Sequence, residues 1–86
     1  MISPYRVFIA ADVIATLRTC RRREQLVITR LLDELARDPF RKGDYVERDE
    51  IGRPVQVLVL GRFAICFWAD HPVKEVKVID LKPAGR

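Results

Sequence analysis

The chain has 86 residues, 49% of them hydrophobic and 33% charged, with a net charge of +4. This length leaves room for one domain over residues 1–86, and the composition excludes a disordered chain. The longest apolar runs are far short of the roughly 20 residues that span a bilayer, and no secretory signal is visible, so we expect a cytoplasmic protein. The modest positive charge permits contact with nucleic acid or another acidic partner without requiring it.

The cysteines and the single histidine bear on metal binding. Cys20 and Cys66 have no CxxC spacing, and only His71 could join them. A zinc site needs about four ligands, more than these side chains supply. A disulfide would need the two cysteines to meet in space, and a cytosolic chain normally keeps them reduced. We therefore expect two buried thiols, no metal and no cofactor.

The chain begins with a predicted strand and a short helix. Residues 5–10, YRVFIA, alternate loosely and are rich in aromatic and β-branched residues, which predicts the strand. Asp12 is expected to cap a helix that directs Val13, Ile14 and Leu17 toward a core. A helix would therefore follow the first strand directly.

A second helix follows the arginine run at 21–23 and has the clearest periodicity in the chain. Its predicted apolar face consists of Val27, Ile28, Leu31, Leu32 and Leu35. Pro39 ends this helix, because a proline disfavours helical geometry at the residue before it.

Beyond Pro39 the hydrophobic period changes from helical to two, which predicts four successive strands. They are YVERDE (45–50), PVQVLVL (54–60), RFAICFWA (62–69) and EVKVIDL (75–81). The charged first strand suits a sheet edge, whereas the next two are apolar on both faces and suit the centre. The sequence thus predicts an α+β fold, β-α-α-β-β-β-β, in which a two-helix hairpin packs on a mainly antiparallel twisted sheet.

The segment RFAICFWADH (62–71) contains the only tryptophan and the only histidine of the chain. Trp68 continues the alternation of a predicted central strand, a pattern typical of core packing. His71 lies in the turn-forming triplet DHP, so we expect an exposed turn residue rather than a catalytic one. Only Arg62 of this segment remains a candidate for function.

Basic residues are the other candidates for chemistry. They are Arg41, Lys42, Arg48, Arg53, Lys82 and Arg86. Each alone is typical of a solvated surface, but an antiparallel sheet can bring several of them to one face. Such a face would bind a phosphate backbone and stabilise the charge that develops during phosphodiester cleavage.

The order of elements, the helix end LLDELARDPF, the strand GRFAICF and the closing strand KEVKVIDL resemble the small toxins of the RelE/ParE superfamily, which includes HigB. The resemblance covers nearly the whole chain and lies in layout motifs. It implies a cytoplasmic toxin of a type II toxin–antitoxin module, of the kind linked to plasmid stabilisation. A cognate antitoxin would wrap and neutralise it.

The resemblance implies one of two activities. Members similar to RelE and HigB cleave mRNA in the ribosomal A site without a metal, and positioning and charge stabilisation support in-line attack of the 2′-hydroxyl. Members similar to ParE inhibit DNA gyrase and are not nucleases. We expect the first activity, a ribosome-dependent mRNA endoribonuclease that inhibits translation. The alternative is a non-enzymatic binding module, either a gyrase inhibitor or an inactive antitoxin-binding member.

The resemblance also assigns candidate site residues. Arg62 matches, offset by one position, the arginine of the family strand that follows a glycine turn, and we expect it to be catalytic. The region where family nucleases gather RNA-binding residues contains Arg41, Lys42, Arg48 and Arg53. The end of the chain, DLKPAGR, has no Tyr or His where many nuclease members carry an acid or base. Lys82, Arg86 or Tyr45 is therefore expected to take that role.

Overall fold

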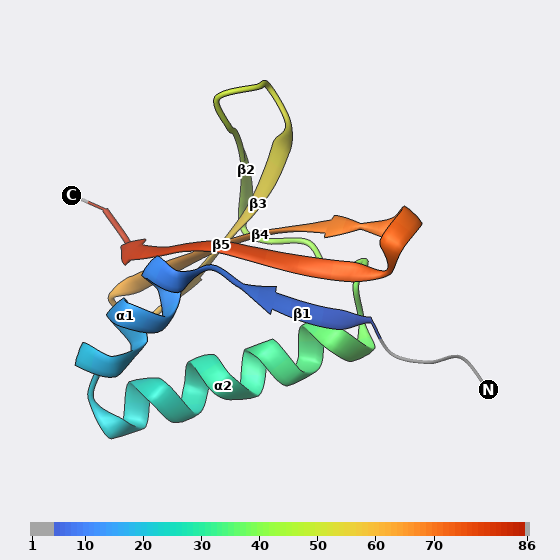
Figure 1. Cartoon of the computed structure of the whole chain (residues 1–86). Helices are drawn as coiled ribbons and strands as arrows, with labels where there is room; N and C mark the ends of the chain where they lie inside the picture. The colour runs from blue at the N-terminus through green and yellow to red at the C-terminus, as the bar shows by residue number, and fades with distance from the viewer. Residues whose placement is uncertain (1–4, 86) are drawn as a thin grey trace.

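The computed structural model describes residues 5–85 and contains the predicted order of elements. In chain order they are β1 (Arg6–Ile9), α1 (Ala11–Thr19), α2 (Arg22–Arg37), β2 (Tyr45–Arg48), β3 (Pro54–Leu60), β4 (Phe63–Asp70), the short 3-10 turn η1 (His71–Val73) and β5 (Glu75–Pro83). The strands form one sheet in the order β1-β5-β4-β3-β2 (Figure 1). The predicted α+β fold is confirmed. Within the described residues, neither helix is long and apolar enough to cross a membrane.

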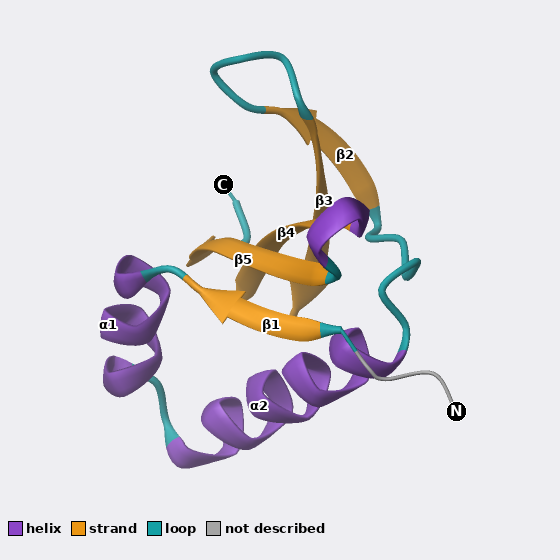
Figure 2. Cartoon of the chain, turned by 45° about the vertical axis from the view of Figure 1, so that its right-hand side comes forward, coloured by secondary structure: helices purple, strands orange, loops and turns teal. Residues whose placement is uncertain are grey.

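The sheet is antiparallel except at one edge. β5 pairs in parallel with β1 and antiparallel with β4, and the β4–β3 and β3–β2 pairs are antiparallel as well. The charged strand β2 is an edge strand, as predicted, whereas β3 and β4 have a neighbour on each side. The β2–β3 hairpin projects away from the two helices (Figure 2). β2 therefore has a neighbouring strand, β3, on one side only.

Helix α2 packs on one face of the sheet through a narrow apolar stripe. Its buried residues are Ile28, Leu31, Leu32 and Leu35. In the core they cluster with Val13 of α1, Ile65 and Phe67 of β4, and Val76 and Val78 of β5. The prediction was wrong for Val27, which is 46% exposed. At 100° per residue, Val27 lies about a quarter turn from the centre of the stripe, beyond the contact with the sheet.

Helix α1 begins earlier than the sequence predicts. Ala10 is its N-cap, so the expected capping role of Asp12 is wrong. The Ala10 N–H donates to the Val78 carbonyl at 3.0 Å, and the chain therefore passes from the sheet into the helix without a spacer. Asp12 lies in the first turn, where a negative charge favours the helix dipole. Val13 is buried as expected, whereas Ile14 is 39% exposed.

The sheet face opposite the helices has a second, smaller apolar cluster, formed by Val55, Val57, Ala64 and Cys66. We call this side of the sheet the open face, because neither helix covers it. Cys66 is buried in this cluster, and Cys20 is buried in the main core. The two thiols are free and buried, as predicted.

Trp68 is not a core residue, contrary to the prediction. Side chains alternate along β4, so Phe63, Ile65 and Phe67 contribute to the core beneath the helices while Ala64, Cys66 and Trp68 lie on the open face. Trp68 lies near the end of β4. Because no second layer of secondary structure covers this face, the indole stays half-buried.

The buried stripe of α2 can be tested with a pair of leucines on the same helix. Leu35→Ala should lower the free energy of unfolding by about 2–5 kcal/mol, because Leu35 is fully buried and alanine leaves a cavity. Leu26 is 53% exposed, and Leu26→Ala should change it by no more than about 0.5 kcal/mol. Urea unfolding followed by circular dichroism measures both. Equal losses in the two variants would contradict this packing.

Candidate nucleic-acid interface

The segment between α2 and β2 is attached to β3 by three hydrogen bonds. The Gly43 N–H donates to Oε1 of Gln56 at 2.8 Å, and the Asp44 N–H donates to the Val57 carbonyl at 2.7 Å. The Val59 N–H donates in turn to Oδ2 of Asp44 at 2.8 Å. A Cβ atom on residue 43 would lie 2.4 Å from the Val57 carbonyl oxygen, so this close approach requires glycine.

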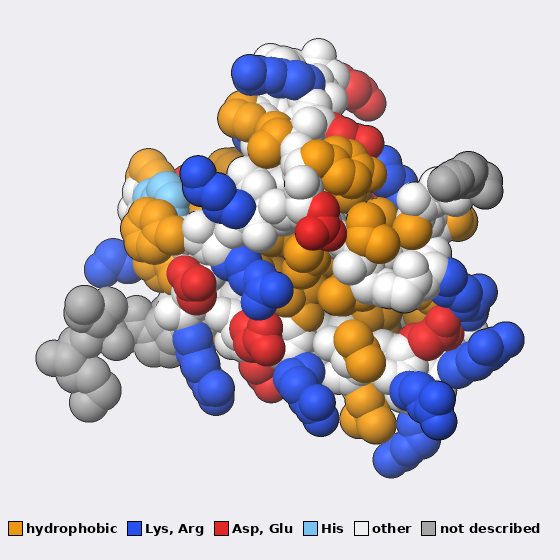
Figure 3. Space-filling view, turned by 180° about the vertical axis from the view of Figure 1, so that it is seen from behind, with side chains coloured by type: hydrophobic (Ala, Val, Ile, Leu, Met, Phe, Trp, Pro, Cys, Tyr) orange, Lys and Arg blue, Asp and Glu red, His pale blue; other side chains and the backbone are white. Residues whose placement is uncertain are grey.

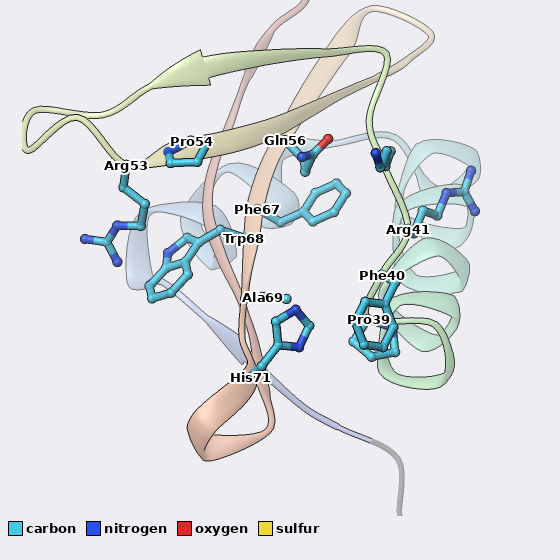
Figure 4. Close-up of a pocket in the computed structure, with 11 residues that line it drawn as sticks. Pro39, Phe40, Arg41, Arg53, Pro54, Gln56, Phe67, Trp68, Ala69 and His71 are labelled. Carbon is cyan, nitrogen blue, oxygen red and sulfur yellow. The ribbon is translucent and has the colours of Figure 1, made fainter.

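A cavity of about 380 Å³ lies between this segment and the sheet. We call it the loop cavity; its lining residues are Pro39, Phe40, Arg41, Lys42, Arg53, Pro54, Gln56, Phe67, Trp68, Ala69 and His71. Arg53 and Trp68 lie on one side, Pro39 and Phe40 on the other, and His71 at one end (Figure 4). Three of the predicted RNA-binding residues, Arg41, Lys42 and Arg53, thus line a single cavity.

Three aromatic rings meet at one end of the loop cavity. The Phe40 and His71 rings stack with centroids 4.7 Å apart and planes 17° from parallel. Tyr5 contacts His71 edge-on, and its hydroxyl lies 2.9 Å from Nδ1 of the imidazole. His71 is exposed and lies in the turn after β4, as predicted. Its ring orientation is nevertheless set by two residues that are distant in sequence.

The open face presents Trp68 between two cations. The Arg53 guanidinium lies 4.0 Å from the indole centroid, and Nζ of Lys77 lies 5.3 Å from it. Both distances are within the range of cation–π attraction. Because Arg53 and Trp68 also line the loop cavity, the open face and the cavity form one continuous surface. Seen from behind the view of Figure 1, exposed hydrophobic side chains lie among both basic and acidic ones (Figure 3).

Carboxylates partner the cations of the open face. Nε of Arg53 lies 3.0 Å from Asp49. Nζ of Lys77 lies 3.2 Å from Asp70 and 3.9 Å from Glu75. These pairs are partly exposed, so each contributes little to stability and a phosphate can compete for the cation.

Lys82 and Tyr45, both predicted catalytic residues, lie on the open face. Tyr45 pairs with Val57 and Lys82 with Ala64, which places each on the side of the second apolar cluster. Nζ of Lys82 donates to Oε1 of Glu47 at 3.1 Å, and this hydrogen bond raises the pKa of the lysine. Lys82 is therefore held in its charged form at neutral pH.

The remaining predicted residues have other contacts. Arg48 donates to the Gly52 carbonyl and lines, together with Lys82, a small cavity of about 90 Å³. Arg41 is part of the cavity wall, but its guanidinium lies 2.7 Å from Glu34 of α2. Arg62, in the β3–β4 turn, forms an ion pair with Glu24 and contributes to neither the cavity nor the Trp68 cluster. Arg86 lies outside the described residues.

The Arg62–Glu24 pair joins the β3–β4 turn to the first turn of α2. Arg62 donates to both carboxylate oxygens, one of them at 2.9 Å, and the Arg21 N–H donates to the same carboxylate at 2.9 Å. These hydrogen bonds, with Arg62 first, hold the pKa of Glu24 at about 2, well below its ordinary value of 4.5. The geometry therefore makes Arg62 a link between helix and sheet.

Sequence reasoning missed Lys77 and the roles of Trp68, Phe40 and Tyr5. Trp68 and Lys77 are directly paired in the β4–β5 ladder, so a correct hairpin register would have placed them together. Phe40 and His71 are 31 positions apart, and Tyr5 and His71 are 66 apart; no local pattern links them.

No family model and no curated protein matches the chain in sequence. Solved structures match it closely in fold. The RelE–RelB complex of the archaeon Pyrococcus horikoshii matches with a TM-score of 0.81 and 21% identity, over 96% of this chain and 98% of that chain. The toxin–antitoxin complex RelBE2 of Mycobacterium tuberculosis matches with a TM-score of 0.75 and 18% identity, over 93% and 98%.

The two likenesses define the class of fold. It is a small α+β fold in which two helices cover one face of a five-stranded, mostly antiparallel sheet. This is the RelE fold, and the chain has it over nearly its full length. The fold implied by the resemblance to RelE/ParE toxins is thus confirmed.

The Glu24–Arg62 pair predicts how stability depends on pH. Since the pKa of Glu24 is about 2 in the folded state and near 4.5 when the chain is unfolded, its stabilisation is complete above pH 4.5. It is lost as the pH falls toward 2. Glu24→Gln removes this contribution, so the melting temperature of the variant should lie below that of the native protein at neutral pH. The difference should shrink between pH 4.5 and 2. Thermal melts measure it, and a gap that stays constant with pH would contradict the pairing.

Proposed function

We propose that this protein is the toxin of a type II toxin–antitoxin module and that it inhibits translation in the cytoplasm by cleaving mRNA on the ribosome. The observation that carries the proposal is the gathering of Arg41, Lys42 and Arg53 around one cavity that adjoins Trp68. Cations bind the RNA backbone, and aromatic rings stack on unpaired bases. The likeness to a RelE–RelB complex and to a toxin–antitoxin complex supports the toxin role and a cognate antitoxin as partner.

The chemistry suited to this surface is charge stabilisation. When a 2′-hydroxyl attacks the adjacent phosphorus in line, its proton passes to solvent, a 2′,3′-cyclic phosphate forms, and the bond from phosphorus to the 5′-oxygen of the leaving nucleotide breaks. Negative charge grows on the phosphate oxygens during this step. Arg53 and Lys42 would stabilise that charge. Lys82, whose pKa is raised by Glu47, would act as a cation or proton donor rather than as a base. Tyr45 lies on the same face as Lys82, and its phenol can accept or donate a hydrogen bond.

A second candidate function is non-enzymatic binding, with DNA gyrase as the target or the antitoxin as the only partner. The observation that favours it is the pairing of Arg53, Lys77 and Lys82 with carboxylates. A surface on which positive and negative groups alternate suits a protein partner as well as RNA.

Expression from a tightly controlled promoter, with mapping of mRNA 5′ ends, tests the nuclease. The native chain should produce cuts at fixed positions within codons. A double variant, Lys42→Ala with Arg53→Ala, should reduce them by about 100-fold or more, because two groups that stabilise the transition state are lost. Arg18→Ala with Arg30→Ala removes the same charge from exposed helix positions and should leave the cuts unchanged.

Other outcomes would contradict the proposal. A DNA damage response with intact mRNA would replace the nuclease with gyrase inhibition. Normal growth during expression of the native chain would count against both toxic activities.

A further inference from the structure

The loop cavity has the size and lining of a site for a flat, polar ring. Its volume of about 380 Å³ falls in the lower part of the range of small-molecule sites. We propose that it binds one unpaired nucleobase of an RNA. The proposal rests on the proposed function in that RNA is the ligand.

Phe40 provides the stacking surface. One face of its ring packs on His71, and the side chain is nevertheless 69% exposed. The partner ring is itself held, because the Tyr5 hydroxyl lies 2.9 Å from its Nδ1. An exposed phenyl ring backed by an oriented imidazole is a rigid platform, so little conformational entropy is lost when a base stacks on it.

Gln56 supplies polarity inside the cavity. Its Oε1 accepts the hydrogen bond of the Gly43 backbone N–H, and this assigns the orientation of the amide. The amide NH2 group therefore has the role of donor. A donor at this position can pair with a ring carbonyl of uracil, cytosine or guanine, or with a ring nitrogen of adenine. One hydrogen bond of this kind corresponds to about fivefold in affinity.

The cations around the cavity suit the phosphate that accompanies a base. Lys42 is exposed and lines the cavity, and Arg53 lies beside Trp68 on the wall opposite Phe40. Arg53 also lies on the open face. When one nucleotide of an RNA occupies the cavity, the adjacent nucleotide of that RNA would therefore lie on the open face. This positive charge favours a nucleotide over the aromatic side chain of a protein, which carries no phosphate for Lys42 and Arg53.

Trp68 makes the test direct, because it is the only tryptophan of the chain and lines the cavity. Purified protein is titrated with UMP, GMP and AMP while tryptophan fluorescence is recorded. All three nucleotides should change the fluorescence saturably. Ribose 5-phosphate and N-acetylphenylalanine amide, which represent the phosphate alone and an aromatic side chain, should bind at least tenfold more weakly than UMP.

Two exposed phenylalanines give a matched pair of variants. Phe40→Ala should weaken UMP binding by about tenfold or more, because the stacking surface is lost. Phe8 is 58% exposed on β1, outside the cavity, and Phe8→Ala should leave binding unchanged. Lys42→Ala keeps Phe40 in place and should weaken every nucleotide alike. It therefore tests the site even where Phe40→Ala disturbs the fold.

Gln56→Glu tests the contribution of the amide donor. The glutamate keeps an acceptor for the Gly43 N–H but loses the NH2 donor and adds a negative charge. UMP binding should therefore weaken by about fivefold or more, and unchanged UMP binding would show that Gln56 does not contact the base.

Several results would overturn the inference. They are equal binding of ribose 5-phosphate and UMP, equal binding of the phenylalanine amide and UMP, and no binding of any nucleotide. Because the titration needs neither ribosome nor cleavage, its outcome is separate from that of the proposed function. If Phe40→Ala still produced codon-positioned cuts and no nucleotide bound, the base site would be rejected and the proposed nuclease activity would stand. If nucleotides bound but the native chain produced no mRNA cuts, the proposed nuclease activity would be rejected and the base site would stand.

Discussion

The packing of the apolar stripe of α2 on one face of the sheet is the contact on which the other features depend. It buries Leu35 and its neighbours against β4 and β5 and leaves the other face open. It also holds the end of α2 beside β1, where the Tyr5 N–H donates to the Ala36 carbonyl. Because β2 lies at the opposite edge of the sheet, the chain after Arg37 must cross toward it. Along this segment the Phe40 ring stacks on His71, and the Gly43 N–H donates to Gln56 of β3. The segment thereby forms one wall of the loop cavity.

The charges divide into two kinds according to what they connect. Arg62 and Glu24 join a sheet turn to a helix, and the strongly lowered pKa of Glu24 reflects a carboxylate with several donors. Arg53 and Lys77 instead surround an aromatic ring, and their carboxylate partners are partly exposed. Exposed pairs are weak and are screened by salt, so an incoming phosphate can replace them. The cations around Trp68 therefore suit ligand binding, whereas the Arg62–Glu24 pair suits the stability of the fold.

The candidate site follows from the sequence only in part. The cations Arg41, Lys42 and Arg53 could be chosen because basic residues concentrate near the entry to the sheet, and they do line one cavity. Arg62 was chosen by its match to a family strand, but its side chain turns to Glu24 instead. Neither Phe40 nor Tyr5 carries a local signal, since each acquires its contact with His71 only when the termini of distant elements meet.

Hydrophobic periodicity by itself determined the order β-α-α-β-β-β-β, the charged edge strand β2 and the end of α2 before Pro39, because each depends on neighbours a few positions apart. It could not determine which face of β4 would be covered, so Trp68 was assigned to the core. Tertiary structure decided that, because two helices suffice for only one face of a five-stranded sheet. It also decided the loop cavity, whose walls come from segments up to 32 residues apart in the chain, from Pro39 to His71.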